Sequence, residues 1–227
     1  MKNPLITFLL LPAFLPGLAA ATNLSYTYRE ITGAESKTFN WELLEKGDQV
    51  LITSSGAEEK LVNVCRRDGL TLRWSVTQGS DTDFQAERIA NTISLRGRFQ
   101  GKKIEKYLNI DERPWFQPLS YCLRTLSRGD TKTLSFWTIR MDTLELVAMQ
   151  AERRGEELIR IEGKKIETRR VEIRKEGFLS VMWSANYWFR TDDNVFVQYR
   201  GTHGFPGTPE THVTLSRADS AWTDSNI

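Results

Sequence analysis

Histidine and cysteine are scarce in this chain of 227 residues, which limits the chemistry that its side chains can support. The only histidines are His203 and His212, and neither belongs to an H-E-x-x-H pattern or a comparable metal-binding spacing. The sequence also lacks a G-x-S-x-G nucleophile elbow, a P-loop and a G-x-G-x-x-G turn. We therefore expect no metal site, no cofactor and no catalytic residues.

The chain also lacks an excess of positively or negatively charged residues. The chain has 31 Lys and Arg residues and 29 Asp and Glu residues, with a formal net charge of +2. Because the two signs are interspersed, we do not expect binding to nucleic acid. The six basic residues between positions 164 and 175 are balanced by six glutamates between positions 156 and 176, which is typical of a solvated strand face.

The first 21 residues have the three parts of a secretory signal peptide: a lysine near the start, an apolar run over residues 5–18 and an A-x-A cleavage site. The apolar run is short for a spanning helix, which needs roughly 20 apolar residues, and two prolines interrupt it. We expect a periplasmic or secreted protein that begins at Thr22, with no stable membrane span after signal cleavage.

Apolar and polar residues alternate over most of residues 22–227, which predicts short β-strands. The alternation is clearest at Leu70, Leu72, Trp74 and Val76. Turn residues at short intervals favour antiparallel pairing, since parallel strands need long crossovers. Arg154-Gly155 is interpreted as one such turn, between strands at 143–153 and 157–162.

Fourteen or fifteen strands exceed what one flat sheet holds without curling. No Gly/Ser-rich or Pro-rich linker divides residues 22–227, so we expect a single β domain with a frayed tail over 219–227. The predicted fold is mainly β: a strongly curved antiparallel sheet, or an unclosed β-barrel, with one helix as its lid or plug.

The only amphipathic helix pattern covers Gln117 to Gly129, with the helix itself from about Pro118 to Ser127. Pro118 suits the first helical position, and Gly129 suits a left-handed residue that ends the helix. Apolar residues recur at i, i+3, i+4 and i+7: Leu119, Cys122, Leu123 and Leu126. The pattern places Arg124, Ser127 and Arg128 on the other side. One face must therefore cover something apolar.

Cys65 and Cys122 are the only cysteines, and both lie in the exported part of the chain. An oxidising compartment permits a disulfide, which would stabilise by roughly 4 kcal/mol across the intervening loop and would tie the helix to an early strand. Two buried thiols are the alternative, and the sequence does not decide between them.

Large aromatic residues are abundant, with seven tryptophans. Such rings are ordinary core residues in a curved sheet, but they can also line a site for an apolar or sugar ligand beneath the helix. The candidate ligand-binding residues are the helix residues Leu119, Leu123 and Leu126 and the aromatics Trp74, Trp137, Trp183, Tyr187 and Trp188.

The stretches Pro118-Leu119-Ser120, Leu123-Arg124 and Arg128-Gly129-Asp130 resemble the helix and following turn of a large family of exported bacterial proteins known as a domain of unknown function. The later stretch 161–168, continuing through Trp183 to Val195-Phe196-Val197, is similar to that family's closing strands. The resemblance implies a fold like that of periplasmic lipoprotein carriers of the Lol type, in which a helix covers an apolar cavity within an unclosed barrel. It supplies no catalytic residues, and the carriers have several helices where this chain has one.

The leading hypothesis is a periplasmic, non-enzymatic protein that holds an apolar ligand, a lipid or an acylated partner between sheet and helix, in envelope maintenance. A second hypothesis is an interaction scaffold with a solidly packed interior that recruits an envelope protein through its strand edges. A third is a carbohydrate-acting enzyme, because two carboxylates can converge in space without a linear signature.

Overall fold

The computed structural model describes residues 23–177, 183–202 and 208–218. The expected signal peptide, the cleavage site before Thr22, His203 and the tail over 219–227 lie outside these residues. Among the described residues, no helix is long and apolar enough to cross a membrane.

The described chain is built almost entirely of β-strands, as the alternating pattern predicts. The strands are β1 (Asn23–Thr32), β2 (Glu35–Lys46), β3 (Gln49–Ser55), β4 (Glu59–Arg66), β5 (Thr71–Gln78), β6 (Thr82–Ile89), β7 (Thr92–Phe99), β8 (Lys102–Asn109), β9 (Thr133–Ile139), β10 (Leu146–Ile161), β11 (Lys164–Lys175), β12 (Ser184–Arg190), β13 (Phe196–Thr202) and β14 (Glu210–Ala218). Two short helical segments, α1 (Leu119–Cys122) and α2 (Arg124–Arg128), lie between β8 and β9.

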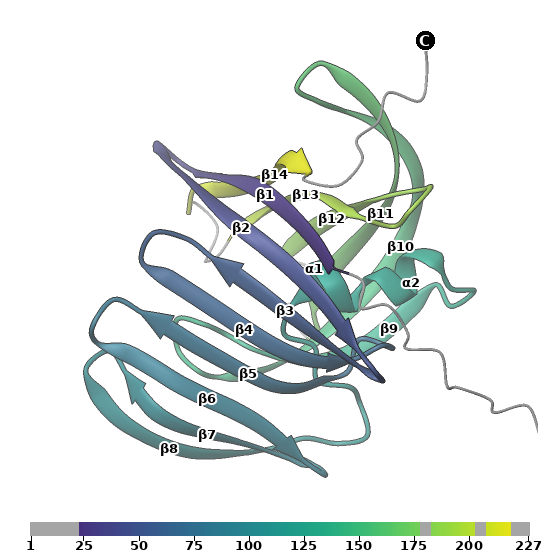
Figure 1. Ribbon diagram of the computed structural model, residues 1–227. Helices are drawn as coiled ribbons and strands as arrows, with labels where there is room; N and C mark the ends of the chain where they lie inside the picture. The colour runs from purple at the N-terminus through teal and green to yellow at the C-terminus, as the bar shows by residue number, and fades with distance from the viewer. Residues whose placement is uncertain (1–22, 178–182, 203–207, 219–227) are drawn as a thin grey trace, which may run out of the picture.

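All fourteen strands form one antiparallel sheet in the order β8-β7-β6-β5-β4-β3-β2-β1-β14-β13-β12-β11-β10-β9. Each strand pairs with its neighbours in sequence, except that β1 pairs with β14 and that β8 does not pair with β9. The two free edges are therefore the strands that flank the helical segments in the chain. Figure 1 shows the sheet bent strongly, with α1 and α2 inside the bend. The predicted curved, unclosed antiparallel sheet with one helix is confirmed.

The expected turn at Arg154-Gly155 is wrong. Residues 146–161 form one continuous strand, β10, which pairs with β11 along its length. Gly155 has a φ of +135° and lies where the register shifts, so it makes a β-bulge rather than a turn. A glycine in a strand-like pattern is compatible with a turn or with a bulge, and the continuous pairing of β10 with β11 gives the bulge.

Residues 114–117 cross from strand β5 to the free edge strand β9 and form hydrogen bonds with both. The backbone N–H of Thr71 at the start of β5 donates to the Trp115 carbonyl at 2.9 Å, and the N–H of Phe116 donates to the Trp137 carbonyl of β9 at 2.8 Å. The Gln117 side chain continues this pairing, since its amide exchanges two hydrogen bonds with the backbone of Ile139, at 2.9 and 3.1 Å. The crossing segment thus fastens the edge of β9 to the middle of the sheet.

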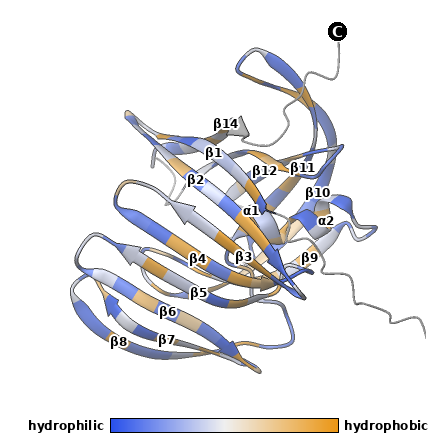
Figure 2. Ribbon diagram, in the orientation of Figure 1, coloured by the Kyte–Doolittle hydropathy of each residue, from blue (hydrophilic) through white to orange (hydrophobic). Residues whose placement is uncertain are grey.

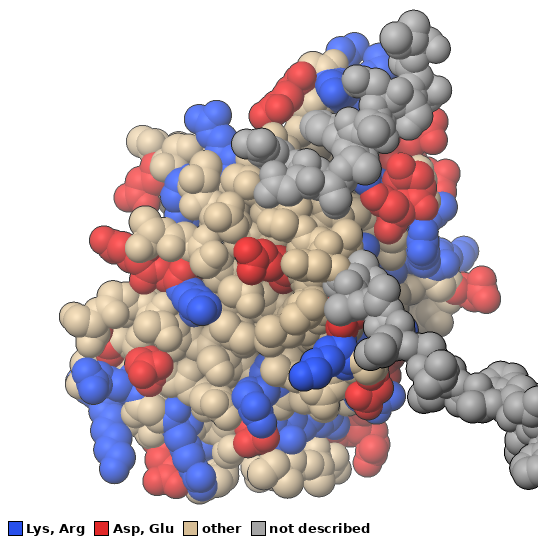
Figure 3. All heavy atoms as spheres, viewed as in Figure 1, with Lys and Arg blue, Asp and Glu red and all other residues tan. Residues whose placement is uncertain are grey.

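The buried side chains form two clusters. The larger one lies between α1–α2 and the strands β1–β4 and β9–β14, and it includes Trp41, Leu123 and Phe189. The smaller one lies on β5–β8 and is covered by the crossing segment and the β9–β10 turn. Figure 2 shows the bands of apolar and polar residues along the strands that result from this alternation. The face seen in Figure 3 carries interspersed charges of both signs, in agreement with the balanced composition.

Gly69, in the β4–β5 turn, is a point at which the helix and the sheet approach each other closely. Its φ is +92°, and a Cβ there would lie 3.0 Å from the Cys122 Cα and 3.1 Å from its carbonyl oxygen. Replacement of Gly69 by alanine should lower the free energy of unfolding by about 2–4 kcal/mol, because backbone strain and the clash with α1 add. Urea denaturation measures this loss.

Gly79→Ala is the matched control for Gly69→Ala. Gly79 has a φ of +53°, but nothing lies within 4 Å of a Cβ built there, so only the backbone term of about 1–2 kcal/mol should be lost. Equal losses in the two variants would contradict the close packing of α1 on the β4–β5 turn.

Candidate functional site

The predicted helix is present but is divided at Leu123, whose φ of −75° and ψ of −6° interrupt the regular turn between α1 and α2. Pro118 is the N-cap residue rather than the first helical residue, and its carbonyl accepts hydrogen bonds from the backbone N–H groups of Tyr121 and Cys122. The expectation of a left-handed Gly129 is wrong. Gly129 is extended, with φ −73° and ψ 172°, and a Cβ there would lie only 2.8 Å from the Thr125 carbonyl. Glycine is therefore suited to this position because a side chain would clash with the Thr125 carbonyl, and not because the backbone angles require glycine.

The helix buries more of its surface than one face. Cys122 and Leu123 are fully buried and Leu126 nearly so, as the spacing predicts, while Leu119 is partly buried. Ser127 is also fully buried, although the helical pattern places it on the polar side. The reason is that α2 lies in a bend of the sheet, where β10 and β11 also contact it. A helix on a flat sheet would leave that side exposed.

The polar side of the helix is fastened to the turn between β12 and β13. The Arg124 Nε donates to the carbonyl of Asn194 at 2.8 Å, and the Asn194 Nδ2 donates back to the carbonyl of Arg124 at 2.8 Å. At the end of α2, the Arg128 Nη2 donates to the Asp192 carbonyl at 2.8 Å. These bonds hold the helix in place over the apolar interior.

An ion pair orders this same turn. The Asp193 carboxylate accepts hydrogen bonds from the Arg190 Nε at 2.9 Å and from the backbone N–H of Val195 at 3.0 Å. Burial by itself would raise the pKa of Asp193, but the Arg190 guanidinium and the Val195 N–H more than offset burial and hold that pKa below its ordinary value. The charged form of Asp193 thus maintains the turn that the helix binds.

Cys65 and Cys122 are both fully buried free thiols, so the structure shows the second of the two alternatives that the sequence leaves open, and no disulfide joins them. The two side chains nevertheless lie together. The Thr71 Oγ1 is 3.8 Å from the Cys65 Sγ and 3.9 Å from the Cys122 Sγ. Burial, followed by the proximity of Cys65, raises the pKa of the Cys122 thiol well above its ordinary value. The expected covalent tie between the helix and an early strand is therefore absent, and the two are in contact by packing alone.

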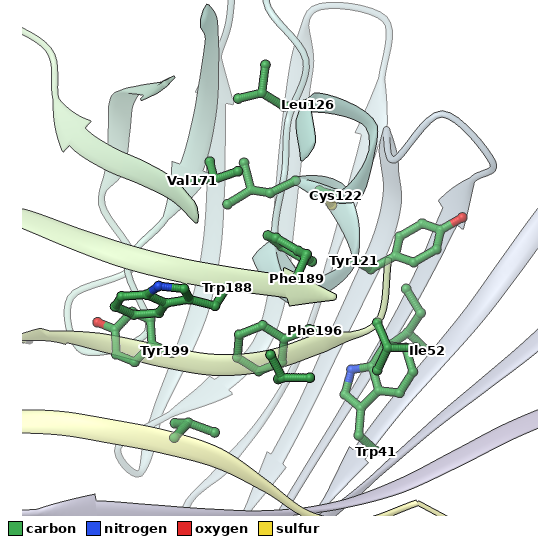
Figure 4. Packing of buried hydrophobic residues seen from close by; sticks show 14 of the residues in the cluster. Trp41, Ile52, Tyr121, Cys122, Leu126, Val171, Trp188, Phe189, Phe196 and Tyr199 are labelled. Atoms are coloured by element: carbon green, nitrogen blue, oxygen red, sulfur yellow. The ribbon is translucent and has the colours of Figure 1, made fainter. Parts of the chain in front are cut away.

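The interior beneath α1 is filled. Aromatic rings from β1, β2 and β13 pack against one another there, with centroid distances of 5.8 Å for Tyr26 and Trp41 and 5.3 Å for Tyr28 and Phe196. The crevice that these four rings form with Ser120, Arg124 and Val195 has no space for a water molecule. Figure 4 shows Phe189 and Phe196 between the side chains of the helix and those of the facing strands.

The sequence did not single out Tyr26, Tyr28, Trp41 or Phe196 as residues of the site. A signal for two of them was present, because Tyr26 and Tyr28 alternate with polar residues and so must share one face of a strand. That this face lies beneath the helix depends on the pairing of β1 with β14, which joins opposite ends of the chain.

The predicted ligand-binding residues divide between the two clusters. The three helix leucines and the aromatics Trp183, Tyr187 and Trp188 belong to the larger cluster or pack against it. Trp74 and Trp137 belong to the smaller one. Trp74 packs edge-on against Phe84 at 5.1 Å, and the Trp137 indole donates to Asp111 at 2.8 Å. These two tryptophans are therefore not brought together with the helix leucines, and alternation within single strands could not show which half of the sheet each would face.

An open cleft of about 330 Å³ lies beside α2. It is lined by Asp68, Leu70, Arg88, Glu112, Pro114, Phe116, Thr125 and Leu134. Two carboxylates, Asp68 and Glu112, and the aromatic Phe116 are among these residues, which are the residue types that the enzyme hypothesis requires. Both oxygens of Asp68 are already engaged, one by Arg66 at 2.6 Å and the other by the backbone N–H of Leu70 at 3.1 Å. No group of three or more metal-ligating side chains occurs within the described ranges.

No protein-family model matches the sequence, and no curated protein matches it. The structure is similar to that of a β-barrel-like protein of the domain-of-unknown-function family DUF1849 from Brucella abortus, with a TM-score of 0.59 and 10% identity over 88% of this chain and 98% of that one. It also matches the hypothetical lipoprotein YmcC from Escherichia coli, with a TM-score of 0.39 and 12% identity over 86% and 84% of the two chains. A LolA superfamily protein from Nitrosomonas europaea matches with a TM-score of 0.22 and 7% identity over 87% and 84%. Of these three, the Brucella protein is the one that shows a shared fold.

Leu123→Asp should lower the free energy of unfolding by more than about 4 kcal/mol, because Leu123 is fully buried and an unpaired carboxylate cannot be desolvated cheaply. Thr125→Asp adds the same charge at an exposed position of the same helix and should change stability by about 0.5 kcal/mol or less. Thermal and urea denaturation of both variants would check this, and similar losses would mean that the helix is only loosely docked.

Stability should fall at low pH partly through Asp193. Its folded-state pKa is depressed, so its contribution is complete above the ordinary value of 3.8 and is lost as the pH falls through the lower folded-state pKa. Asp193→Asn should therefore be less stable than the parent at neutral pH and should lose less stability below about pH 4. Denaturation curves across this range test the prediction, with Asp48→Asn, at an exposed turn, as control. Parallel pH profiles for the parent and Asp193→Asn would contradict it.

Proposed function

We propose that the protein is an envelope binding protein that holds the apolar chain of a lipid or an acylated partner between its curved sheet and α1–α2, and that the chain enters by displacement of the helix. The observation that carries this proposal is the way the helix is held. It covers the larger apolar cluster, yet it is only ten residues long. A few polar contacts fasten it: Arg124 and Arg128 bond to the β12–β13 turn, the Tyr121 hydroxyl donates to the Arg67 carbonyl, and the Arg153 guanidinium donates to the Gly129 carbonyl.

The free energy lost when the helix side chains leave the interior is similar in size to the free energy gained when an acyl chain is buried there. Burial of a leucine-sized side chain contributes about 1.5–3 kcal/mol, so removal of four such side chains from the interior costs on the order of 6–12 kcal/mol. An acyl chain contributes about 0.8 kcal/mol per buried methylene, so a dozen methylenes contribute on the order of 10 kcal/mol. A single long chain is therefore sufficient to replace the helix, while a small apolar molecule is not.

The resemblance to Lol-type carriers gives this proposal its biological setting. In those proteins a helix covers an apolar cavity in an unclosed barrel, and the present chain likewise has an unclosed sheet with a helix inside its bend. The expected signal peptide would deliver it to the periplasm, where acylated proteins and lipids are available partners. The filled crevice beneath α1 is then the ligand-free, closed arrangement.

The proposal is tested by the rate at which purified protein takes up a fatty-acyl fluorophore. Arg124→Met removes the hydrogen bonds from Arg124 to the Asn194 and Asp193 carbonyls, so it should destabilise the closed helix and speed uptake about tenfold or more. Arg140→Met, which removes an ion pair with Asp142 at another turn, should leave the rate unchanged. Native mass spectrometry of the unmodified protein should show a bound lipid.

Failure of every form to take up the fluorophore, together with no co-purifying lipid, would reject the proposal. Uptake at equal rates in the parent and in Arg124→Met would reject helix displacement as the route. Either result would favour the second candidate function, an interaction scaffold.

The scaffold hypothesis has one specific observation in its favour, the packed interior itself. Strand β8 forms a free edge of the sheet, with Tyr107 57% exposed. Three lysines, Lys102, Lys103 and Lys106, lie along that edge and oppose indiscriminate pairing with other strands. A partner strand at this edge would have to be acidic.

A further inference from the structure

The edge strand β8 has backbone groups that point away from the sheet. β8 pairs with β7 over all eight of its residues, and Figure 1 shows it as the outermost strand of its half of the sheet. The backbone N–H of Ile110, directly after β8, donates to the Asn91 carbonyl at 2.9 Å. Backbone groups alternate in direction along an antiparallel strand, so Ile110 and every second residue before it bond toward β7. The residues between them therefore direct their N–H and C=O groups outward: Lys103, Glu105, Tyr107 and Asn109.

The other edge strand, β9, is already occupied. The backbone N–H of Trp137 donates to the Pro114 carbonyl at 2.8 Å, and the Trp137 carbonyl accepts a hydrogen bond from the N–H of Phe116 at 2.8 Å. Among the described residues, no backbone hydrogen bond of this kind reaches the outward side of β8. Of the two edges, β8 is thus the one whose backbone groups are available to another strand.

β8 lacks most of the features by which proteins prevent pairing at a sheet edge. It contains no proline, its register with β7 has no bulge, and it is longer than a typical strand. Only charge discourages pairing, because the β7–β8 hairpin over residues 92–109 contains five basic residues and one acidic residue. An excess of positive charge opposes basic partners but attracts acidic ones.

The single acidic residue of this hairpin, Glu105, is already compensated. Its carboxylate lies 3.4 Å from the Arg96 Nε and accepts a hydrogen bond from the Tyr107 hydroxyl at 2.8 Å. Within the described chain, the lysines of β8 form no ion pair: Lys102, Lys103 and Lys106. Pairing of two copies of this edge would bring the lysines of both copies together, so charge repulsion opposes it.

We propose that β8 pairs with an extended acidic segment of a partner protein, which adds to the sheet as a further strand. Main-chain hydrogen bonds to the outward groups of β8 hold the segment, and its carboxylates lie beside the three lysines. Tyr107, which is 57% exposed, gives the segment an apolar contact. The inference rests on the second candidate function and makes it specific. It does not depend on lipid binding, because Ile104 and Leu108 of β8 pack against the smaller buried cluster and not against the one beneath the helix.

The test measures binding of fluorescein-labelled nine-residue peptides to the purified protein by fluorescence anisotropy. A peptide that alternates Glu and Val should bind about tenfold or more tightly than one that alternates Lys and Val, and its affinity should fall as salt is added. An N-methylated form of the Glu peptide, which lacks N–H donors, should not bind. Amide hydrogen exchange followed by NMR should show slower exchange, when the Glu peptide is bound, at the outward N–H groups of β8.

Glu105→Pro and Glu105→Ala separate backbone pairing from charge. Both variants remove the same carboxylate, but only proline removes the outward N–H, and a proline whose missing N–H faces solvent is tolerated at a sheet edge. Glu105→Pro should therefore bind the Glu peptide about tenfold or more weakly than Glu105→Ala. Thermal denaturation checks that both variants are folded.

Lys106→Glu tests the contribution of charge at the same edge. It should weaken binding of the Glu peptide, because it places a carboxylate beside the carboxylates of the peptide. Lys46→Glu is the matched control, since Lys46 is exposed at the end of β2, and it should leave binding unchanged.

The outcomes separate this inference from lipid binding. Equal affinity of Glu105→Pro and Glu105→Ala, or binding of the N-methylated peptide, would overturn strand pairing. Equal affinity for the Glu and Lys peptides would overturn the acidic partner. Failure of both peptides to bind would reject the site on β8 and leave lipid uptake standing. Dimerisation of the parent in sedimentation velocity that Glu105→Pro abolishes would overturn the proposal by assigning this edge to a second copy of the chain.

Discussion

The pairing of β1 with β14 is the constraint on which the rest of the molecule depends. Every other pair in the sheet joins strands that follow each other in sequence, so these pairs alone would give two separate meanders, β1–β8 and β9–β14. Joining them through β1 and β14 puts opposite ends of the chain at the centre of one sheet. It also leaves β8 and β9 as free edges, and the only covalent link between those edges is the segment that carries the helix.

This link explains why the helix lies where it does. Residues 114–117 bond to β5 on one side and to β9 on the other, so the chain enters the helix from inside the bend of the sheet. The apolar residues of α1–α2 therefore pack into the interior between the strands of the β1–β8 meander and those of the β9–β14 meander. The helix completes the packed interior of a sheet that does not close on itself, and its polar side bonds to the β12–β13 turn.

The packed interior and the cleft beside it have different roles in this picture. Beneath α1 the rings of β1, β2 and β13 fill the space, so ligand entry there requires movement. The cleft beside α2 is open without any movement, and its lining includes Phe116, whose ring lies 5.4 Å from that of Phe136 in the main interior. The Brucella protein that shares the fold belongs to a family of unknown function, so the chemistry of this molecule has to be argued from its own residues.

The sequence by itself determined the local elements. Alternation at Leu70 to Val76 predicted strand β5 and the burial of Trp74 and Val76, but Thr71, on the predicted polar side, is fully buried next to a register shift. The spacing of Leu119, Cys122, Leu123 and Leu126 predicted a helix with an apolar side, because this pattern reports short-range periodicity. Which strands meet across the chain was decided only in the tertiary structure, since β1–β14 pairing leaves no local signal. Tertiary packing alone decided that Ser127 is buried, that Trp74 and Trp137 belong to a different cluster from the helix leucines, and that Gly155 lies at a bulge within one strand. Each of these depends on contacts between residues far apart in the chain, which periodicity does not encode.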